Sequence, residues 1–154
     1  MTIEDKLAIQ EAIARYSYAY DSKDAGAFAQ LFVEDGVFEV TVLGTSSPTV
    51  KLSSRAAIRE WAAQRHHLSP ACQARHYQSG VLFDELTSET ATTRTMLLLT
   101  KQDTPDATPL LHLTGVYCDK WRKTREGWRL VHREARVDRD PGLHDTGNSQ
   151  EKRH

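Results

Sequence analysis

Two side chains in this sequence could cooperate in proton transfer, an aspartate at position 21 and a histidine at position 76. Asp21 directly follows Tyr20 at the end of a predicted amphipathic helix, where the negative partial charge of the helix terminus disfavours a carboxylate. Stability alone therefore does not explain Asp21, although a turn formed with Ser22 and Asp24 is the structural alternative. His76 opens a predicted strand, where a lone histidine is usually structural. A carboxylate that fixed one tautomer of its ring would instead make it a general base near neutral pH.

A cation on the last predicted strand, Trp128–Val137, is the next candidate. In a strictly alternating strand Arg133 shares a face with Ala135 and Val137, so we expect it to be half buried. A guanidinium in that position needs an anionic partner or an anionic group on a substrate. A surface or structural ion pair with Asp138 or with the neighbours of Glu134 is the alternative.

The remaining histidines and the common catalytic motifs add little chemistry. His66 and His67 are adjacent, so on a helix they point in different directions and are poor partners for one metal ion. His112 and His132 are expected on the outer face of the sheet or at a dimer surface. The sequence has no glycine-rich nucleotide loop, no HExxH motif and no GxSxG motif, which argues against nucleotide folds, zinc proteases and serine hydrolases.

The elements that would position these residues come in the order helix, helix, strand, helix and then several strands. Apolar residues at three- and four-residue spacing predict a first helix that ends near Asp21, and Asp24 is placed to cap a second helix, Ala25–Phe32. A turn at Glu34–Gly36 precedes the first strand, and a serine caps a third helix that runs to about His66. The expected strands are Val37–Val42, His76–Phe83, Thr90–Lys101, Leu110–Arg122 and Trp128–Val137.

This order predicts an α+β domain in which the N-terminal helices cover one face of a curved, mostly antiparallel sheet. The sheet and helices would enclose a cavity, the usual place for a small-molecule site, and Phe38, Trp61, Met96 and Leu98 are candidates for its lining. The bare outer face of the sheet would need another subunit, so we expect a homodimer or a higher homo-oligomer. We assign residues 1–140 to this domain and residues 141–154 to a polar, mobile tail.

Composition narrows the remaining function classes. The 154 residues are 39% hydrophobic and 27% charged, which suits a single folded domain. Twenty Lys and Arg against 21 Asp and Glu give a net charge of -1, which argues against nucleic-acid binding through phosphate attraction. No apolar run is long enough for a membrane span, the chain opens with no secretory signal, and Cys72 and Cys118 form no CxxC pattern. We therefore expect a cytoplasmic protein without disulfides, bound zinc or a membrane segment.

Several short motifs, taken in order, resemble the SnoaL-like family of the nuclear transport factor 2-like (NTF2-like) superfamily. The likeness extends over roughly residues 3–140. Each motif alone is weak, and their order and spacing together make the resemblance specific. The motifs are Tyr16-x-x-x-Tyr20-Asp21-x-x-Asp24, Leu31-Phe32-x-x-Asp35-Gly36-x-Phe38, Arg75-His76-Tyr77, Thr114-Gly115-x-Tyr117-x-Asp119-x-Trp121 and Gly127-Trp128-Arg129-Leu130.

This resemblance implies a cone-shaped α+β barrel around a deep apolar cavity, commonly in a dimer. The chain is most similar to the branch that holds scytalone dehydratase, hexachlorocyclohexane dehydrochlorinase and bile-acid 7α-dehydratase. In that branch an aspartate at the end of the first helix pairs with a strand histidine that removes a substrate proton. Asp21 and His76 match these positions, Arg133 matches the last-strand arginine of the dehydrochlorinase, and Tyr16 matches a tyrosine of the bile-acid enzyme. The second strand histidine of scytalone dehydratase has no counterpart in Thr90–Lys101, which argues against scytalone itself as substrate.

The sequence thus predicts a dehydratase-like lyase or isomerase, independent of cofactors and metals, that acts on a small, largely apolar cyclic substrate. His76 would abstract a proton, Asp21 would orient it, and Tyr16, Tyr20 or Arg133 would stabilise the developing negative charge. Polyketide cyclisation uses the same chemistry. A non-catalytic ligand carrier, or an accessory subunit like the β subunit of ring-hydroxylating dioxygenases, is the alternative. The substrate-binding candidates are Tyr20, Phe38, Trp61, Met96, Leu98, Leu113 and Tyr117.

Overall fold

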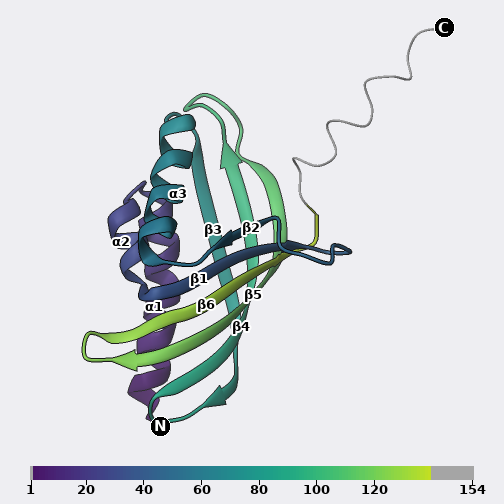
Figure 1. Ribbon diagram of the computed structural model, residues 1–154. Coiled ribbons are helices and arrows are strands. Elements are labelled where there is room, and N and C mark those ends of the chain that lie inside the picture. Colours follow the sequence, from purple (N-terminus) through teal and green to yellow (C-terminus); the bar gives the residue numbers. More distant parts are fainter. Residues whose placement is uncertain (1, 140–154) are drawn as a thin grey trace, which may run out of the picture.

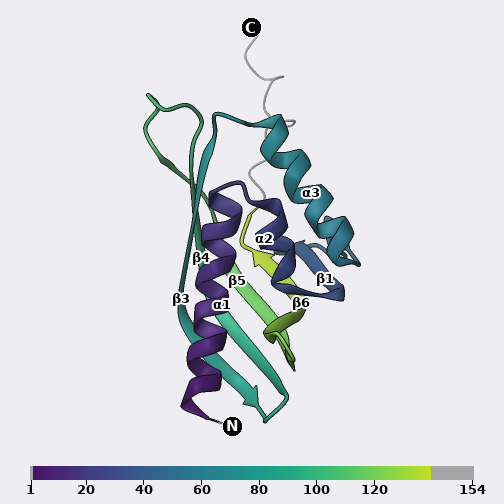
Figure 2. The same cartoon turned by 90° about the vertical axis from the view of Figure 1, so that its left-hand side faces the viewer.

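This computed structural model describes residues 2–139, which contain three helices and six strands joined by loops (Figure 1). The helices lie on one side of a single curved sheet, and the turned view in Figure 2 shows the first helix running along it. The elements are α1 (Ile3–Asp21), α2 (Ala25–Gln30), β1 (Phe32–Val42), β2 (Val50–Leu52), α3 (Arg55–Leu68), β3 (Gln73–Leu86), β4 (Thr90–Gln102), β5 (Leu110–Thr124) and β6 (Gly127–Val137).

The sheet has the strand order β2-β1-β6-β5-β4-β3, and every pair is antiparallel except β1 with β6. It curves around the helices without closing, since no pairing within residues 2–139 joins the edge strands β2 and β3. The predicted α+β class and the mostly antiparallel sheet are therefore confirmed. The hairpins expected between the last strands are present, and Gly127, at φ +103°, follows the two-residue turn between β5 and β6.

Side-chain caps define where the helices begin. The Thr2 hydroxyl accepts a hydrogen bond from the Asp5 N–H at 3.2 Å, and the Asp5 carboxylate accepts one from the Thr2 N–H at 3.2 Å, which completes a capping box. Asp24 and Ser54 each accept one backbone N–H at the starts of α2 and α3. α1 then runs as far as Asp21, which places this carboxylate at the helix C-terminus as predicted.

Two predicted boundaries near β1 are wrong. α2 ends at Gln30, and Phe32, expected in that helix, already pairs with β6. The expected turn Glu34–Gly36 lies within the span of β1, at a point where its register with β6 shifts. Gly36 permits this irregular path, because a Cβ there would lie 2.9 Å from the carbonyl oxygen of Val33. The short strand β2 was also not expected, and the predicted tail lies outside the described residues.

A bulge in β3 changes which side chains face the helices. The register with β4 shifts between Ser79 and Leu82, where Gly80 adopts a left-handed backbone at φ +64°. Strict alternation places Leu82 on the face of His76, but beyond the bulge Leu82 points outward and is 56% exposed. Phe83 packs against the core instead.

A second bulge, in β6, sets the position of the arginine predicted on that strand. The pairing of β6 with β5 shifts at Val131, so Trp128 and Leu130 are buried on the same side as Arg133. Strict alternation without the bulge would place Trp128 and Leu130 on the opposite face. The inward position of Arg133 is as expected, and its burial is complete rather than partial.

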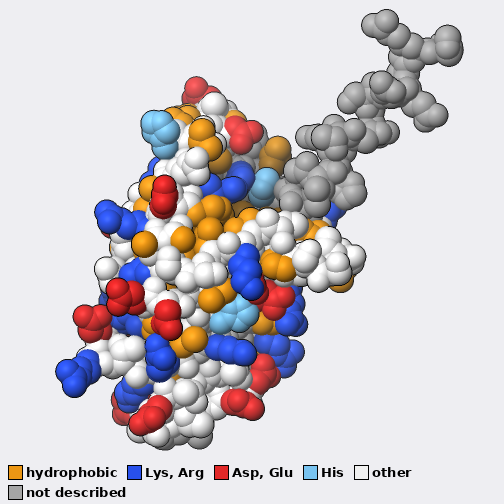
Figure 3. Space-filling model, in the orientation of Figure 1, with side chains coloured by type: hydrophobic (Ala, Val, Ile, Leu, Met, Phe, Trp, Pro, Cys, Tyr) orange, Lys and Arg blue, Asp and Glu red, His pale blue; other side chains and the backbone are white. Residues whose placement is uncertain are grey.

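No helix within residues 2–139 has the length and apolar character to cross a membrane. Figure 3 shows Lys and Arg side chains interspersed with Asp and Glu side chains over the face that it presents.

Candidate active site

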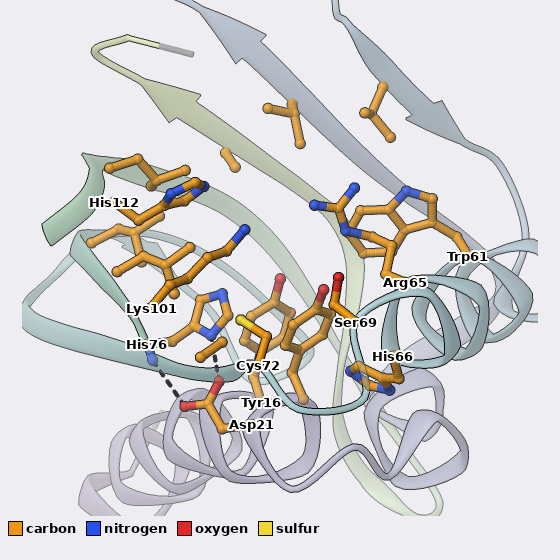
Figure 4. Close-up of a pocket in the computed structure, with 18 of the residues that line it drawn as sticks. Tyr16, Asp21, Trp61, Arg65, His66, Ser69, Cys72, His76, Lys101 and His112 are labelled. Atoms are coloured by element: carbon orange, nitrogen blue, oxygen red, sulfur yellow. Dashed lines mark hydrogen bonds and ion pairs between the residues drawn. The ribbon is translucent and has the colours of Figure 1, made fainter. Parts of the chain in front are cut away.

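Asp21 holds His76 by two hydrogen bonds, one to its ring and one to its backbone (Figure 4). The Oδ1 atom of Asp21 lies 2.6 Å from Nδ1 of His76, and Oδ2 accepts the backbone N–H of His76 at 2.8 Å. Both side chains are largely buried, with 7% of Asp21 and 10% of His76 exposed. The Gln73 side-chain amide donates to the backbone carbonyl of Asp21 at 2.9 Å, which ties the end of α1 to the start of β3.

This geometry selects one tautomer of the His76 ring. A carboxylate can only accept a hydrogen bond, so Nδ1 carries the proton and Nε2 is left with its lone pair. Figure 4 shows the ring nitrogen that does not face Asp21 directed into the cavity. The rings of Tyr20 and Tyr16 contact the imidazole edge to face, with centroids 5.1 Å and 6.2 Å away, and restrict its rotation. The arrangement presents a basic nitrogen to a bound molecule.

The cavity lies between the concave face of the sheet and the helices and has a volume of about 390 Å³. This is large enough for a small organic molecule of a few rings. Of the side chains named from the sequence, the structure places Tyr16, Tyr20, Asp21, Phe38, Trp61, His76, Leu113 and Tyr117 in its lining. Aliphatic side chains from the sheet complete the apolar wall, among them Val40, Leu97, Leu99 and Val137.

The prediction that Met96 and Leu98 line the cavity is wrong. Both side chains point away from the helices, where Met96 is 63% and Leu98 39% exposed. Their neighbours Leu97 and Leu99 face the cavity, because β4 alternates with odd-numbered residues inward. The same phase brings Lys101 into the lining, a residue that the sequence interpretation did not single out.

His112 was expected on the outer face, and the structure places it in the cavity lining. The pairing of β4 with β5 passes from Leu99–Leu113 directly to Thr100–Leu111, so His112 is the extra residue of a third bulge. Bulges next to ligand sites often redirect a side chain in this way. His66 also reaches the cavity, and its ring lies 4.7 Å from that of Tyr20. His132 is not in the lining and pairs with Glu39 at 2.9 Å.

Arg133 lies behind the cavity lining rather than in it. Its guanidinium forms two hydrogen bonds with the Asp119 carboxylate, at 2.8 Å and 2.7 Å, and both side chains are fully buried. The guanidinium carbon stands 4.1 Å from the ring centroid of Tyr16 and 4.0 Å from that of Tyr117. Although burial acts against its charge, the Asp119 carboxylate raises the pKa of Arg133, so the guanidinium stays charged. The ion pair considered as the structural alternative is thus present, with Asp119 and not Asp138 as its partner.

The two tyrosines in contact with Arg133 are neutral phenols at any ordinary pH. Burial raises the pKa of Tyr16 to about 12, although the Arg133 charge acts in the opposite direction. Burial also raises the pKa of Tyr117 well above its ordinary value. A neutral phenol can donate a hydrogen bond, so these residues suit an electrophilic role better than a basic one.

A match to a family model decides what kind of domain this is. The model for a SnoaL-like domain matches residues 1–134, most of the chain. The chain belongs to the SnoaL-like family. The resemblance stated from the short motifs is thereby confirmed.

Solved structures share this SnoaL-like fold. An NTF2-like protein with a cystatin-like fold from Novosphingobium aromaticivorans is 31% identical, with a TM-score of 0.74 over 88% of this chain and 82% of that one. A protein of unknown function from Mycobacterium tuberculosis is 28% identical, with a TM-score of 0.74 over 88% of this chain and 73% of that one. A candidate scytalone dehydratase from N. aromaticivorans, at 23% identity and a TM-score of 0.74 over 89% and 86% of the two chains, shows a common fold. No curated protein sequence matches this SnoaL-like chain.

The described part of this SnoaL-like domain contains no group of three or more His, Cys, Asp or Glu side chains arranged to hold a metal ion. The two cysteines, Cys72 and Cys118, are free thiols and do not form a disulfide. The expectation that the protein works without a cofactor stays a prediction.

Proposed function

We propose that this SnoaL-like protein is a lyase or isomerase that removes a proton from carbon by means of the Asp21–His76 pair. The observation that carries this proposal is the bidentate hydrogen bonding of Asp21, which fixes both the tautomer and the position of His76 beside an apolar cavity. Nε2 of His76 would accept the proton, and the Asp21 carboxylate would stabilise the imidazolium that forms. The substrate is a small, largely apolar molecule, since most of the cavity wall is aliphatic or aromatic.

The charge that develops on the substrate needs a hydrogen-bond donor close to the base. Tyr16 and Tyr20 both line the cavity, and their rings contact His76. Because both phenols have raised pKa values from burial, each keeps its proton and can donate it in a hydrogen bond to an oxyanion. We assign Arg133 a positioning role, in which its guanidinium fixes the rings of Tyr16 and Tyr117 by contacting both.

Polyketide cyclisation begins with the same proton abstraction and remains a form of this proposal. A non-catalytic ligand carrier or an accessory subunit of the dioxygenase β-subunit type would need the cavity but not an oriented imidazole. The two hydrogen bonds of Asp21 therefore favour an enzyme over a binding module.

A carbon-acid probe tests the proposed base without knowledge of the natural substrate. The flat, apolar compound 5-nitrobenzisoxazole loses one C–H proton to a base as its N–O bond breaks, and the product is a coloured phenolate. We expect the wild-type protein to accelerate this reaction, and His76→Gln to lower the rate by about 10²–10⁴-fold, the usual contribution of a general base. His67→Gln, which removes an exposed histidine outside the cavity, serves as the matched control.

The variant Asp21→Asn tests, in the same assay, whether Asp21 orients the His76 ring or only supports the fold. We expect a reduced rate together with a loss of the single ring tautomer, measured from the ¹⁵N chemical shifts of His76, while circular dichroism shows an unchanged fold. A His76→Gln variant as fast as the wild type would refute the proposed mechanism.

We further propose that the protein forms a homodimer through the outer face of its sheet, as the sequence interpretation expected. Met96, Leu98 and Tyr77 are exposed there, and Tyr77 pairs directly with Leu98 across the strands. An exposed apolar surface of this kind is typical of a protein interface. The cytoplasmic location and the absence of a nucleic-acid partner stay predictions.

A further inference from the structure

The cavity lining carries more positive charge than the protein as a whole. Lys23, Arg65 and Lys101 line it, whereas Asp21 is the carboxylate that lines it within the described residues. Asp21 is already bound to His76, so it offers no charge to a neighbouring cation. The complete chain, by contrast, has a net charge of -1. An apolar wall with an excess of cations suggests a ligand that combines an apolar body with a negative group.

Lys101 approaches the cavity from the strand that neighbours His76. His76 pairs with Leu99 and Ala74 pairs with Lys101, so Lys101 and His76 lie diagonally across β3 and β4 on the inward face. Figure 4 shows the Lys101 amine extending into the cavity near the His76 ring. Lys101 takes part in no ion pair with a described residue, because none of the acidic side chains comes within 4.0 Å.

Arg65 reaches the same space from α3, on the opposite side (Figure 4). Its guanidinium stacks against Trp61, 5.0 Å from the ring centroid, which holds the side chain over the cavity. Arg65 also has no ion-pair partner among the described residues. The third cation differs, since the Lys23 amine donates to the backbone carbonyl of Pro70.

The positive charge of Arg65 acts on Lys101. Burial lowers the pKa of Lys101, and the charge of Arg65 lowers it further. Two like charges that face one another across a partly apolar space destabilise the empty site, and an anion placed between them removes that repulsion. Other titratable groups in the lining are Tyr16, Tyr20, His66, Cys72, His112 and Tyr117, and none of these is a carboxylate.

We propose that the ligand of this cavity is an apolar carboxylic acid in its ionised form, with its carboxylate bound between Arg65 and Lys101. This inference names the substrate class for the proposed lyase or isomerase and rests on that function for its catalytic meaning, but binding can be tested alone. The carboxylate would lie on the Lys101 side of His76, which leaves the apolar body against Phe38, Trp61 and the aliphatic strand residues. Arginine and lysine together recognise a carboxylate by charge-assisted hydrogen bonds.

Two probes of the same shape and different charge test this proposal. Naphthalene-2-carboxylate and naphthalene-2-carboxamide differ in the negative charge, and isothermal titration calorimetry at pH 7 gives the affinity of each. We expect the wild-type protein to bind the carboxylate about 100-fold more tightly than the amide, because each of the two charged hydrogen-bonded contacts contributes about tenfold. Arg65→Gln and Lys101→Gln should each weaken carboxylate binding about tenfold and change amide binding by less than about threefold.

Matched variants control for loss of charge and for loss of shape. Arg59→Gln on the exposed side of α3 and Lys120→Gln on the outer face of β5 remove one positive charge each and should leave both affinities unchanged. Arg65→Lys keeps the charge and should recover most of the preference for the carboxylate.

The outcomes separate this proposal from the proposed function. A wild-type protein that fails to bind the carboxylate, or that binds both probes equally, overturns the carboxylate site. The same holds if Arg65→Gln and Lys101→Gln keep the full preference. His76→Gln should retain the preference for the carboxylate, since His76 is not one of the two cations. If His76→Gln also keeps the full rate with 5-nitrobenzisoxazole, the proposed mechanism fails while the carboxylate site stands.

Discussion

At the scale of single residues, the burial of Arg133 needs an explanation, because a guanidinium loses several kcal/mol of hydration in an apolar interior. Asp119 supplies two of the compensating hydrogen bonds, and the faces of Tyr16 and Tyr117 supply cation–π contacts. Nη1 of Arg133 nevertheless has no hydrogen-bond partner within the described residues. The pair therefore fixes two aromatic rings beside the cavity at a cost in stability that an apolar core would not have.

The Arg133–Asp119 pair gives a test at this scale. Asp119→Asn leaves a buried guanidinium without its counter-charge and should lower the free energy of unfolding by about 3–5 kcal/mol. In a chain of this size the melting temperature would fall by roughly 10 °C. Asp84→Asn breaks the exposed pair with Arg94 and should cost less than about 1 kcal/mol.

A double variant keeps this test informative if Asp119→Asn does not fold. Arg133→Met combined with Asp119→Leu replaces both charges with apolar side chains, so we expect a stability close to that of the wild type in urea titrations. Equal unfolding midpoints for the wild type, Asp119→Asn and the double variant would show that the pair has no energetic role.

At the scale of the elements, the sequence allowed the helices and the Asp21–His76 pair to be predicted because their signals are local. The apolar spacing and the caps define α1, and the position of Asp21 follows from where α1 ends. His76 lies near the start of β3, and the motifs of the family placed it opposite Asp21. Both residues were thus identified, but only the structure could supply the distance between them.

The alternation of the long strands could not be predicted in the same way. Residues 96–99 are all apolar, so no period distinguishes the inward from the outward face, and Met96 and Leu98 were placed on the wrong one. His112 was misplaced because a bulge is a property of the pairing of two strands, which neither strand shows alone. Arg65 and Lys101 were missed since exposed helix cations and strand-end lysines are common and carry no motif.

Gly115 in β5 gives a test at this scale. A Cβ at Gly115 would lie 2.3 Å from the carbonyl oxygen of Arg136 and 2.9 Å from Cα of Val137, both backbone atoms of β6. Gly115→Ala should therefore force β5 and β6 apart and cost roughly 1–3 kcal/mol in urea unfolding. Gly26→Ala in α2, where the nearest atom is 3.5 Å away, should instead stabilise the fold by about 0.4–1 kcal/mol. Equal stabilities of the two variants would contradict this account of the β5–β6 contact.

At the scale of the whole molecule, the sheet has one covered face and one bare face. The helices and the cavity occupy the concave side, and within the described part of the chain no helix covers the exposed apolar residues on the other side. Met96 pairs with Val116 and Leu98 with both Thr114 and Tyr77, which makes this outer patch continuous over three strands. A second copy that covered the patch would leave the cavity unobstructed, since the two lie on opposite faces of the sheet.

Light scattering on a sizing column tests the proposed homodimer. We expect the wild-type protein to elute with twice the mass of the chain, and Met96→Glu combined with Leu98→Glu to elute as a monomer, because a buried charge in an interface is costly. Tyr18→Glu, which changes an exposed aromatic on α1, should leave the mass unchanged. A wild-type monomer at all concentrations, or a double variant that stays dimeric, would rule out this interface.

The two hydrogen bonds from His76 to Asp21 also make the opening of this pair observable by hydrogen exchange. The same carboxylate binds the imidazole and the main-chain N–H of His76. That amide proton can therefore exchange with deuterium only when its hydrogen bond to Asp21 breaks. Its exchange rate therefore reports, in the wild-type molecule itself, how often Asp21 and His76 separate.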